Sequence, residues 1–173
     1  LILRTEKEIP TAMRRKVALF CNVGEDAVIE SRDARSIYRV PLNMLAEGLD
    51  SVVLRKLGFD TDTIPAPDMD DWMAVLDKIE NATDEVRIAI VGKYVQLQDA
   101  YKSIRESLHI AAAYNNKKLV LKSILSDDLT NENVAEALAG QQGIIVAPGF
   151  GGRGVEGKFA ALRYPREHGL PCF

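Results

Sequence analysis

The 173-residue sequence has few of the residues on which many functional classes depend. Its two cysteines, Cys21 and Cys172, are too far apart for a metal-binding motif and suit a reducing compartment, where we expect both thiols to be buried. The two histidines, His109 and His168, also have no metal-ligand spacing, so no metal site is expected. The formal net charge of -3 provides no basic field that would attract nucleic acid.

Long apolar runs are missing as well. No stretch is long enough to cross a bilayer, and residues 1–10 (LILRTEKEIP) have no charged region that leads into an apolar one, as a signal peptide would. These absences predict a cytoplasmic protein without a membrane partner. Both ends of the chain read as strand-like sequence, so we expect the chain to be a piece of a longer polypeptide.

The most informative stretch that is present is residues 143–157, GIIVAPGFGGRGVEG. A short apolar run there is followed by a glycine-rich loop, as at the end of a buried strand. Parallel α/β sheets bind ligands at this end of their strands. The glycine spacing fits neither a dinucleotide fingerprint nor a P-loop. Successive loop amides could form an anion-binding nest or half of an oxyanion hole, and a tight surface turn is the alternative.

Strand-like and helix-like segments alternate through the second half of the chain, which predicts an α/β fold with a doubly wound parallel sheet. In order, the segments are residues 86–91, 100–114, 119–125, 131–138, 143–146 and 156–167, with a last strand from Leu170. Asp99 is the expected N-cap of the first helix, and Asn115-Asn116 can end it in left-handed geometry. Pro165 should kink or shorten the last helix.

The first half is less regular. We expect strands at residues 1–5, 16–22 and 27–29, a brief extended run at 36–40, and helices from Pro41 and over 51–57, with Gly48 between them. Residues 60–71 (DTDTIPAPDMDD) are acidic, contain two prolines and show no period, so they read as a linker. A short helix over residues 72–79 follows.

Two polar clusters are further candidate sites, and for each the alternative is an ordinary solvated surface. One lies at a strand end and consists of Lys93, Tyr94, Asp99, Tyr101 and Lys102. The other, with few acids nearby, could hold phosphates and consists of Arg14, Arg15, Lys16, Arg32 and Arg35. We do not expect Cys172 to be a nucleophile, because it lies within an incipient strand and not on the sharp turn after one.

Four segments resemble the CTP synthase family and occur in the family's order: RKVALFCNV, SIYRVPLNML, GKYVQLQDAYKSIRESL and APGFGGRGVEGK. The resemblance implies a glutamine-dependent amidoligase that makes CTP from UTP. ATP and Mg²⁺ would serve to phosphorylate the UTP 4-oxygen, and ammonia from glutamine would displace that phosphate. Residues 1–59 would be the C-terminal part of a P-loop-type synthetase domain, and 60–85 a linker with a short helix. Residues 86–173 would begin a flavodoxin-like class I glutamine amidotransferase domain.

The resemblance also implies roles for individual residues. UTP and CTP would contact Lys16 and Phe20. ATP would be bound by Arg4, Arg32, Asp33 and Ala34. Gly149 would line the glutamine and oxyanion pocket. The region linked to the allosteric activator GTP would comprise Tyr94, Lys102, Arg153, Gly154 and Glu156.

The resemblance places no catalytic residue in this chain. The P-loop and the Mg²⁺ ligands would precede Leu1, and the glutaminase nucleophile would follow Phe173, so we expect the isolated piece to be inactive. The family is typically tetrameric, which implies a homo-oligomer. Two departures from the family pattern are Pro148, which removes an amide donor beside the oxyanion loop, and Gln98, which should loosen the loop before Asp99. The alternative reading is a non-catalytic α/β module that binds nucleotides or serves assembly.

Overall fold

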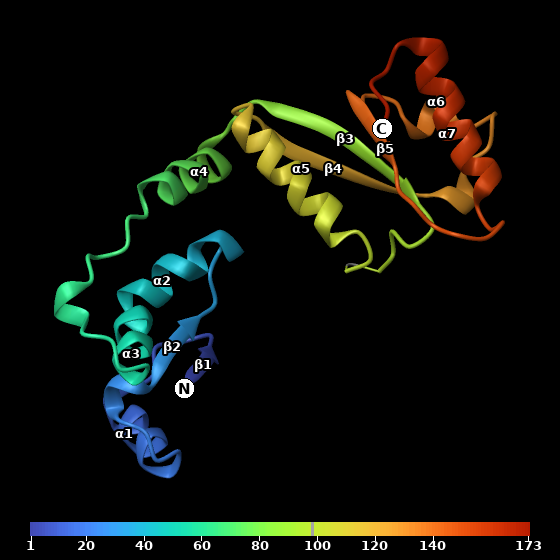
Figure 1. Cartoon of the computed structure of the whole chain (residues 1–173). Coiled ribbons are helices and arrows are strands. Elements are labelled where there is room, and N and C mark those ends of the chain that lie inside the picture. Colours follow the sequence, from blue (N-terminus) through green and yellow to red (C-terminus); the bar gives the residue numbers. More distant parts are fainter. Residues whose placement is uncertain (98) are drawn as a thin grey trace. The chain divides into compact units, whose positions relative to one another are not determined.

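The computed structural model describes residues 1–97 and 99–173 (Figure 1). The chain divides into two compact units, Leu1–Leu76 and Asp77–Phe173, and the division falls within helix α4 (Asp70–Asn81). Both units combine helices with parallel strands, so the expected α/β class with parallel pairing is confirmed. The expected effect of Gln98 on its loop falls outside the described residues.

The N-terminal unit contains a two-stranded parallel sheet, in which β1 (Ile2–Thr5) pairs with β2 (Ile29–Arg32). Its other elements are α1 (Thr11–Phe20), η1 (Glu25–Ala27), η2 (Ile37–Arg39), α2 (Val40–Ala46), α3 (Leu49–Lys56) and η3 (Thr61–Thr63). Ala27, Ile29 and Val52 form its buried apolar cluster. The apolar face of α3 therefore packs against the start of β2.

The strand expected at residues 16–22 is wrong, because residues 16–20 belong to helix α1 and residues 21–22 form the turn that follows it. Pro10 is the N-cap, and its carbonyl accepts from the amides of Met13 and Arg14 at 2.8 and 3.0 Å. Ala18 is buried, but Leu19 and Phe20 are each 79% exposed, so the largest apolar side chains at the end of this run lie at the surface in this chain. Local helix formation from Pro10 onward thus outweighs the apolar run.

Three further expectations for this unit need correction. The strand expected at 27–29 begins only at Ile29, after η1. The expected extended run at 36–40 is instead the 3-10 helix η2 followed by the first residue of α2, and the hydroxyl of the N-cap Ser36 accepts from the Tyr38 amide at 3.2 Å. Cys21 is exposed, as is Cys172 in the other unit, so the expected burial of the thiols is wrong. By contrast, the break at Gly48 between α2 and α3 is confirmed, with φ at 74°.

The C-terminal unit is organised by a three-stranded parallel sheet in the order β4-β3-β5. These strands are β3 (Glu85–Gly92), β4 (Lys118–Leu125) and β5 (Gly143–Val146), as expected from the sequence. The strand expected from Leu170 is present only as a single parallel bridge between Ile144 and Cys172. Residues 171–173 therefore run alongside β5, and the Phe173 carbonyl accepts from the Val146 amide at 2.8 Å.

Helices cover both faces of this sheet (Figure 1). Successive residues of β3 point to opposite faces, so neighbouring β3 side chains pack against different helices. Ile90 packs on the side of α5 (Lys102–Tyr114), together with Ile104 and Leu108. Ala89 and Val91 pack on the other side, with α6 (Val134–Ala137) and α7 (Val155–His168). Because β3 and β5 are paired in parallel, the loops that follow them lie at the same edge of the sheet.

The ends of three helices in this unit differ from expectation. α5 starts at Lys102 with Tyr101 as N-cap, so Asp99 is not its cap, although its carbonyl accepts from the Lys102 amide. α6 is shorter than residues 131–138. Pro165 does not shorten α7, which continues to His168, and the proline is buried. The left-handed end of α5 is confirmed by Asn116, with φ at 52°.

Candidate functional site

The glycine-rich loop, residues 147–154, connects β5 to α7 at the carboxyl edge of the sheet. Two glycines allow the start of α7 to pack closely against the segment after β4. Gly154 has a φ of 68°, and a Cβ atom there would collide with the side chains of Ser126 and Asp127. A Cβ atom on Gly157 would collide with the Ser126 backbone carbonyl. Both positions therefore require glycine for the start of α7 to lie this close to Ser126.

Lys93 holds the centre of this loop. It follows β3 directly, is only 4% exposed, and its Nζ donates to the carbonyls of Phe150 at 2.7 Å and Gly151 at 2.6 Å. A buried ammonium is stable only where hydrogen bonds replace its lost hydration. The two loop carbonyls supply these bonds, so the packing of Lys93 and the shape of the loop depend on each other.

A second lysine reaches the same loop from α7. The Nζ of Lys158 donates to the Ala147 carbonyl at 2.7 Å. Burial and the nearby Lys93 charge together lower the pKa of Lys158 below its usual value. Within residues 1–97 and 99–173, neither lysine forms an ion pair with a carboxylate. Backbone carbonyls, and not acidic side chains, thus balance both charges.

The direction of these carbonyls sets the direction of two amides. A trans peptide unit is planar, and its C=O and N–H groups point in opposite directions. Since the Phe150 and Gly151 carbonyls converge on Lys93, the amides of Gly151 and Gly152 point away from it. At this part of the loop the inner side is therefore a carbonyl cage around a cation, and any anion would approach from the outer side.

Gly149, the expected oxyanion residue, lies in the exposed part of this loop. A Cβ atom there would be 3.6 Å from both the Nζ of Lys158 and the Cδ of Lys93, which is ordinary contact. Gly149 thus lies next to the side chains of both lysines and is open to solvent. Pro148, which has no amide, lies between it and the carbonyl that Lys158 binds.

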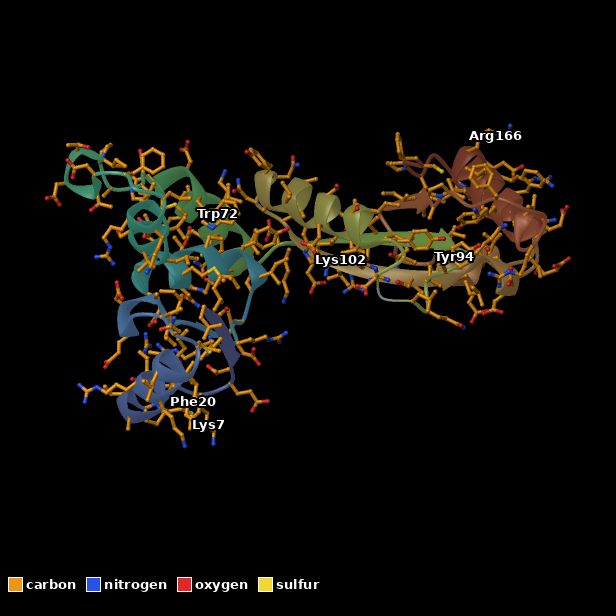
Figure 2. The ribbon with its side chains drawn as sticks, turned by 60° about the horizontal axis from the view of Figure 1, so that its bottom comes forward. Lys7, Phe20, Trp72, Tyr94, Lys102 and Arg166 are labelled. Atoms are coloured by element: carbon orange, nitrogen blue, oxygen red, sulfur yellow. The ribbon has the colours of Figure 1, made fainter. Side chains whose placement is uncertain are left out.

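Part of the expected effector region comes together beside the loop. Arg153 forms an ion pair with Asp127 at 2.7 Å, donates to the Lys93 carbonyl at 3.3 Å, and lies 5.7 Å from the ring centroid of Tyr94. Tyr94, labelled in Figure 2, receives support from Tyr101, whose buried hydroxyl accepts from the Tyr94 amide at 3.3 Å. The structure therefore unites Tyr94, Arg153 and the neighbouring Gly154.

The other two expected effector residues are less closely connected to this group. Glu156 is exposed in the first turn of α7. Lys102 lines a hollow of about 320 Å³ with Asp99, Arg105 and Glu106, none of which belongs to the glycine loop. Figure 2 shows Lys102 at the start of α5.

In the N-terminal unit, all four expected ATP-binding residues line one cavity of about 390 Å³. Its lining comprises Arg4, Ser31, Arg32, Asp33, Ala34, Ser36, Ile37 and Val40. The Nε of Arg4 contacts a carboxylate oxygen of Asp33 at 3.0 Å across the ends of β1 and β2. The cavity thus combines two guanidinium groups, which suit phosphates, with a carboxylate that can accept from an amino group.

The basic cluster predicted from the sequence is not a free group of cations. Arg14 donates to Glu47 at 3.0 Å and to Glu30 at 3.3 Å, and Arg32 lies 3.2 Å from the other oxygen of Glu30. The Glu30 side chain is only 2% exposed. Arg15 pairs with Glu25 at 3.2 Å. The expectation of few acids nearby is therefore wrong, because the fold brings in glutamates that are distant in sequence.

Glu47 closes this network from α2. Burial by itself would raise its pKa, but hydrogen bonds from the Glu30 amide and from Arg14, with the charges of Arg14 and Arg32, lower the pKa below its usual value. Glu30, Arg32 and Glu47 also line a cavity of about 330 Å³ that shares Arg32 and Asp33 with the cavity described above. Arg14 thus connects α1 to β2 through Glu30 and to α2 through Glu47.

The expected UTP and CTP residues lie on α1. Lys16 and Phe20 are one helical turn apart and both are exposed, and Figure 2 shows Phe20 on the surface of α1. Since residues at i and i+4 share a helix face, the two side chains can contact one ligand. Arg14 anchors the same helix to the segment just before β2 through the Val28 carbonyl at 2.8 Å.

Sequence reasoning missed Lys158, Glu30 and Glu47 as members of these sites. For Lys158 a signal existed, since it lies one turn inside a helix that starts directly after the glycine loop. For the two glutamates no local pattern pointed to Arg14. Across residues 1–97 and 99–173 there is no cluster of side chains suited to a metal ion. No helix of this described part combines the length and apolarity needed to cross a membrane.

Comparison with known proteins gives two family matches. Residues 1–59 match the family model described as CTP synthase N-terminus, and residues 96–173 match that of glutamine amidotransferase class-I. The whole chain is 51% identical over 173 residues to a CTP synthase of Bacteroides fragilis, of which it covers 32%. Over 171 residues, or 99% of the chain, it is 53% identical to a CTP synthase of Porphyromonas gingivalis, of which it covers 31%.

A solved structure, the glutaminase domain of Trypanosoma brucei CTPS with bound acivicin, is 37% identical to this chain. That similarity covers 51% of this chain and 35% of the other, with a TM-score of 0.47. The chain spans about a third of the length of the curated relatives it matches, at 32% and 31%. The resemblance to CTP synthase seen in the sequence motifs is confirmed.

Proposed function

We propose that this chain, a segment of CTP synthase that joins the end of the synthetase region to the start of the class I glutamine amidotransferase region, serves CTP formation. The reaction uses UTP, ATP and glutamine. Ammonia released from glutamine displaces phosphate from the activated 4-position of UTP. The observation that carries this proposal is the joint match of one chain to both family regions, with about half of its residues identical to CTP synthases.

In this proposal the N-terminal unit binds nucleotides. The cavity lined by Arg4, Arg32, Asp33 and Ala34 fits ATP, because its guanidinium groups can pair with phosphate oxygens and Asp33 can accept from the adenine amino group. Lys16 and Phe20 contact UTP or the product CTP from α1. Mg²⁺ supplies charge neutralisation at the phosphates, and its ligands belong to parts of the polypeptide outside this chain.

The C-terminal unit begins the glutamine site. Gly149 lines the pocket for glutamine and its oxyanion, which is consistent with its exposed place at the carboxyl edge of the sheet. GTP acts as activator near Tyr94, Lys102, Arg153, Gly154 and Glu156. The nucleophile that attacks glutamine is supplied from beyond this chain, so residues 1–173 alone hydrolyse no glutamine. The proposal further includes a flavodoxin-like sheet in the complete domain, a homotetramer and a cytoplasmic location.

The test uses the longest reading frame that contains this chain. CTP formation is measured with UTP and ATP, once with glutamine and once with added ammonia, which bypasses glutamine hydrolysis. Gly149→Val should reduce the glutamine-dependent rate at least about tenfold, because loss of one oxyanion contact typically costs more than that. The ammonia-dependent rate should change by less than about twofold, since the variant leaves the synthetase chemistry untouched.

Absence of CTP formation from either nitrogen source would refute the proposed function and favour a non-catalytic nucleotide-binding module. If the wild-type protein is active but Gly149→Val retains its full glutamine-dependent rate, the role of Gly149 is refuted and the family function stands. Matched binding assays with ATP and UTP then decide whether the N-terminal unit still serves as a nucleotide site.

A further inference from the structure

Two lysines shape the glycine loop, and the family resemblance assigned no role to either of them. Lys93 approaches from the end of β3 and Lys158 from α7, and their ammonium groups bind three carbonyls of the loop at 2.6 to 2.7 Å. Backbone carbonyls are the only hydrogen-bond acceptors that the structure shows for these two ammonium groups within residues 1–97 and 99–173. The lysines therefore act on the backbone of the loop and not on neighbouring acidic side chains.

We propose that Lys93 and Lys158 are positioning residues of the glutamine site. Lys93 turns two loop carbonyls inward and thereby keeps the amides of Gly151 and Gly152 directed outward, and Lys158 fixes the entrance of the loop beside Gly149. This inference rests on the proposed function, because it assigns the loop to the glutamine site. Neither lysine contacts the reacting atoms in this assignment. Each acts through the backbone that it holds.

The geometry supports this role for Lys93 most directly. One buried Nζ binds two consecutive carbonyls, Phe150 and Gly151, so the orientation of two consecutive peptide planes is set by a single group. Gly151 has a φ of 83°, a conformation that side-chain-bearing residues rarely adopt. Without the ammonium, both carbonyls would lose a charged donor, and these planes could rotate to let water replace it.

Lys158 holds the entrance of the loop instead. It binds the carbonyl of Ala147, whose amide in turn donates to the Val91 carbonyl of β3 at 2.8 Å. The peptide bond that follows this carbonyl leads to Pro148 and has no N–H group. Lys158 therefore fixes the peptide plane at the entrance without orienting an amide donor. Lys158 thus anchors Ala147, the last residue of this segment that is hydrogen-bonded to the sheet, and its Nζ lies next to Gly149.

Lys122 provides a matched control. It also donates from Nζ to a backbone carbonyl, that of Ala137, at 2.7 Å, but it is exposed on β4 and reaches α6 and not the glycine loop. Lys93→Met, Lys158→Met and Lys122→Met therefore remove the same kind of bond at three places. Lys158→Arg keeps a cationic donor at the entrance and serves as the conservative replacement.

In the complete reading frame, Lys93→Met and Lys158→Met should each lower the glutamine-dependent rate of CTP formation at least about tenfold, as expected for a misplaced oxyanion site. The ammonia-dependent rate should stay within about twofold of wild type, and Lys158→Arg should recover most of the glutamine-dependent rate. Lys122→Met should match wild type in both assays. An equal loss of both rates, or lysine variants indistinguishable from Lys122→Met, would overturn the inference.

A second measurement decides the question even if the wild-type protein makes no CTP. In the 173-residue chain, the amides of Ala147 and Val155 flank the loop and donate to the Val91 and Gly152 carbonyls at 2.8 and 3.3 Å; their hydrogen exchange should accelerate at least about tenfold in Lys93→Met relative to Lys122→Met, because the loop between them loses its internal restraint. Unchanged exchange of these amides would refute the positioning role itself. Inactivity of the wild-type enzyme with faster exchange in the variant would refute the proposed function but leave the loop restraint established.

Discussion

Two pairs of basic residues, one pair in each unit of this chain, are balanced in different ways. In the N-terminal unit, Arg14 and Arg32 are paired with Glu30, a carboxylate that is buried. In the C-terminal unit, Lys93 and Lys158 are satisfied by backbone carbonyls of one loop. Ion pairs between side chains tie secondary structure elements together, whereas a lysine bound to carbonyls dictates the local backbone conformation. The first arrangement serves the packing of a unit, and the second serves the shape of a site.

The largest effect that tests this comparison is expected from Gly157→Ala. The new methyl group would collide with the Ser126 backbone carbonyl, so α7 would have to shift, and we expect unit Asp77–Phe173 to lose about 3 kcal/mol of stability. Hydrogen exchange of the β3 amides in increasing urea measures the loss. Gly152→Ala is the control, because nothing lies within 4 Å of its Cβ position, and it should change stability by less than about 0.5 kcal/mol.

The single tryptophan keeps the two units experimentally distinct. Trp72 belongs to the N-terminal unit, where its indole N–H donates to the Tyr38 carbonyl at 2.8 Å. Its fluorescence transition should therefore stay unchanged in Gly157→Ala. A shift of the Trp72 transition as large as the shift in β3 would show that the units unfold together, and the comparison would fail.

Arg14→Met should have the next largest effect, and in the other unit. It leaves the buried Glu30 carboxylate without its guanidinium partner from α1, which we expect to cost about 2 kcal/mol because Arg14 is itself 25% exposed. The Trp72 transition in urea reports this loss. Arg15→Met, which breaks the exposed pair with Glu25, should cost less than about 1 kcal/mol. Equal costs for the two variants would contradict the special role of the buried pair.

A smaller effect is expected from acid. The pKa of Glu47 is lowered in the folded state, so its contribution to stability is complete above the pKa of an unfolded glutamate, about 4.3, and is lost as pH falls through the lower folded value. The urea midpoint of the Trp72 transition should therefore fall with pH in this acidic range. Glu47→Gln should show a shallower slope, since it cannot titrate. Identical slopes in the two proteins would rule out this contribution.

The smallest effect is expected from Phe150→Ser. The Phe150 side chain is fully exposed, at 101%, while its carbonyl is bound by Lys93. If the lysine bond to the carbonyl restrains the loop and the side chain contributes nothing, stability should change by less than about 0.5 kcal/mol. Amide exchange of Ala147 and Val155, which flank the loop and are hydrogen-bonded, should also stay at the wild-type rate. A marked acceleration would mean that the side chain itself restrains the loop.

Elements with a clear period were predictable from the sequence. The strands β3, β4 and β5, the glycine-rich loop and the left-handed end of α5 at Asn116 were all expected, because their signals are local. The run at residues 16–22 was misread because an apolar run does not distinguish a buried strand from the exposed end of a helix. Asp99 was misread as a cap because α5 begins two residues later than its pattern suggests.

The candidate sites were predictable only in part. Arg4, Arg32, Asp33 and Ala34 were expected from the family motifs, and the fold indeed gathers them around one cavity. The glutamates that neutralise Arg14 were not foreseen, because they lie 16 and 33 residues away along the chain. Lys158 was missed because a lysine in an amphipathic helix ordinarily points to solvent.

By itself, the sequence determined the resemblance to CTP synthase, the alternation of strands and helices in the second half, and the place of the glycine loop, since these depend on motifs and on neighbouring residues. Only the tertiary structure decided which groups surround that loop and which carboxylates meet the arginines. Such contacts join residues that are remote along the chain, and burial makes each one obligatory, because a polar group withdrawn from water must find a partner wherever the fold supplies one.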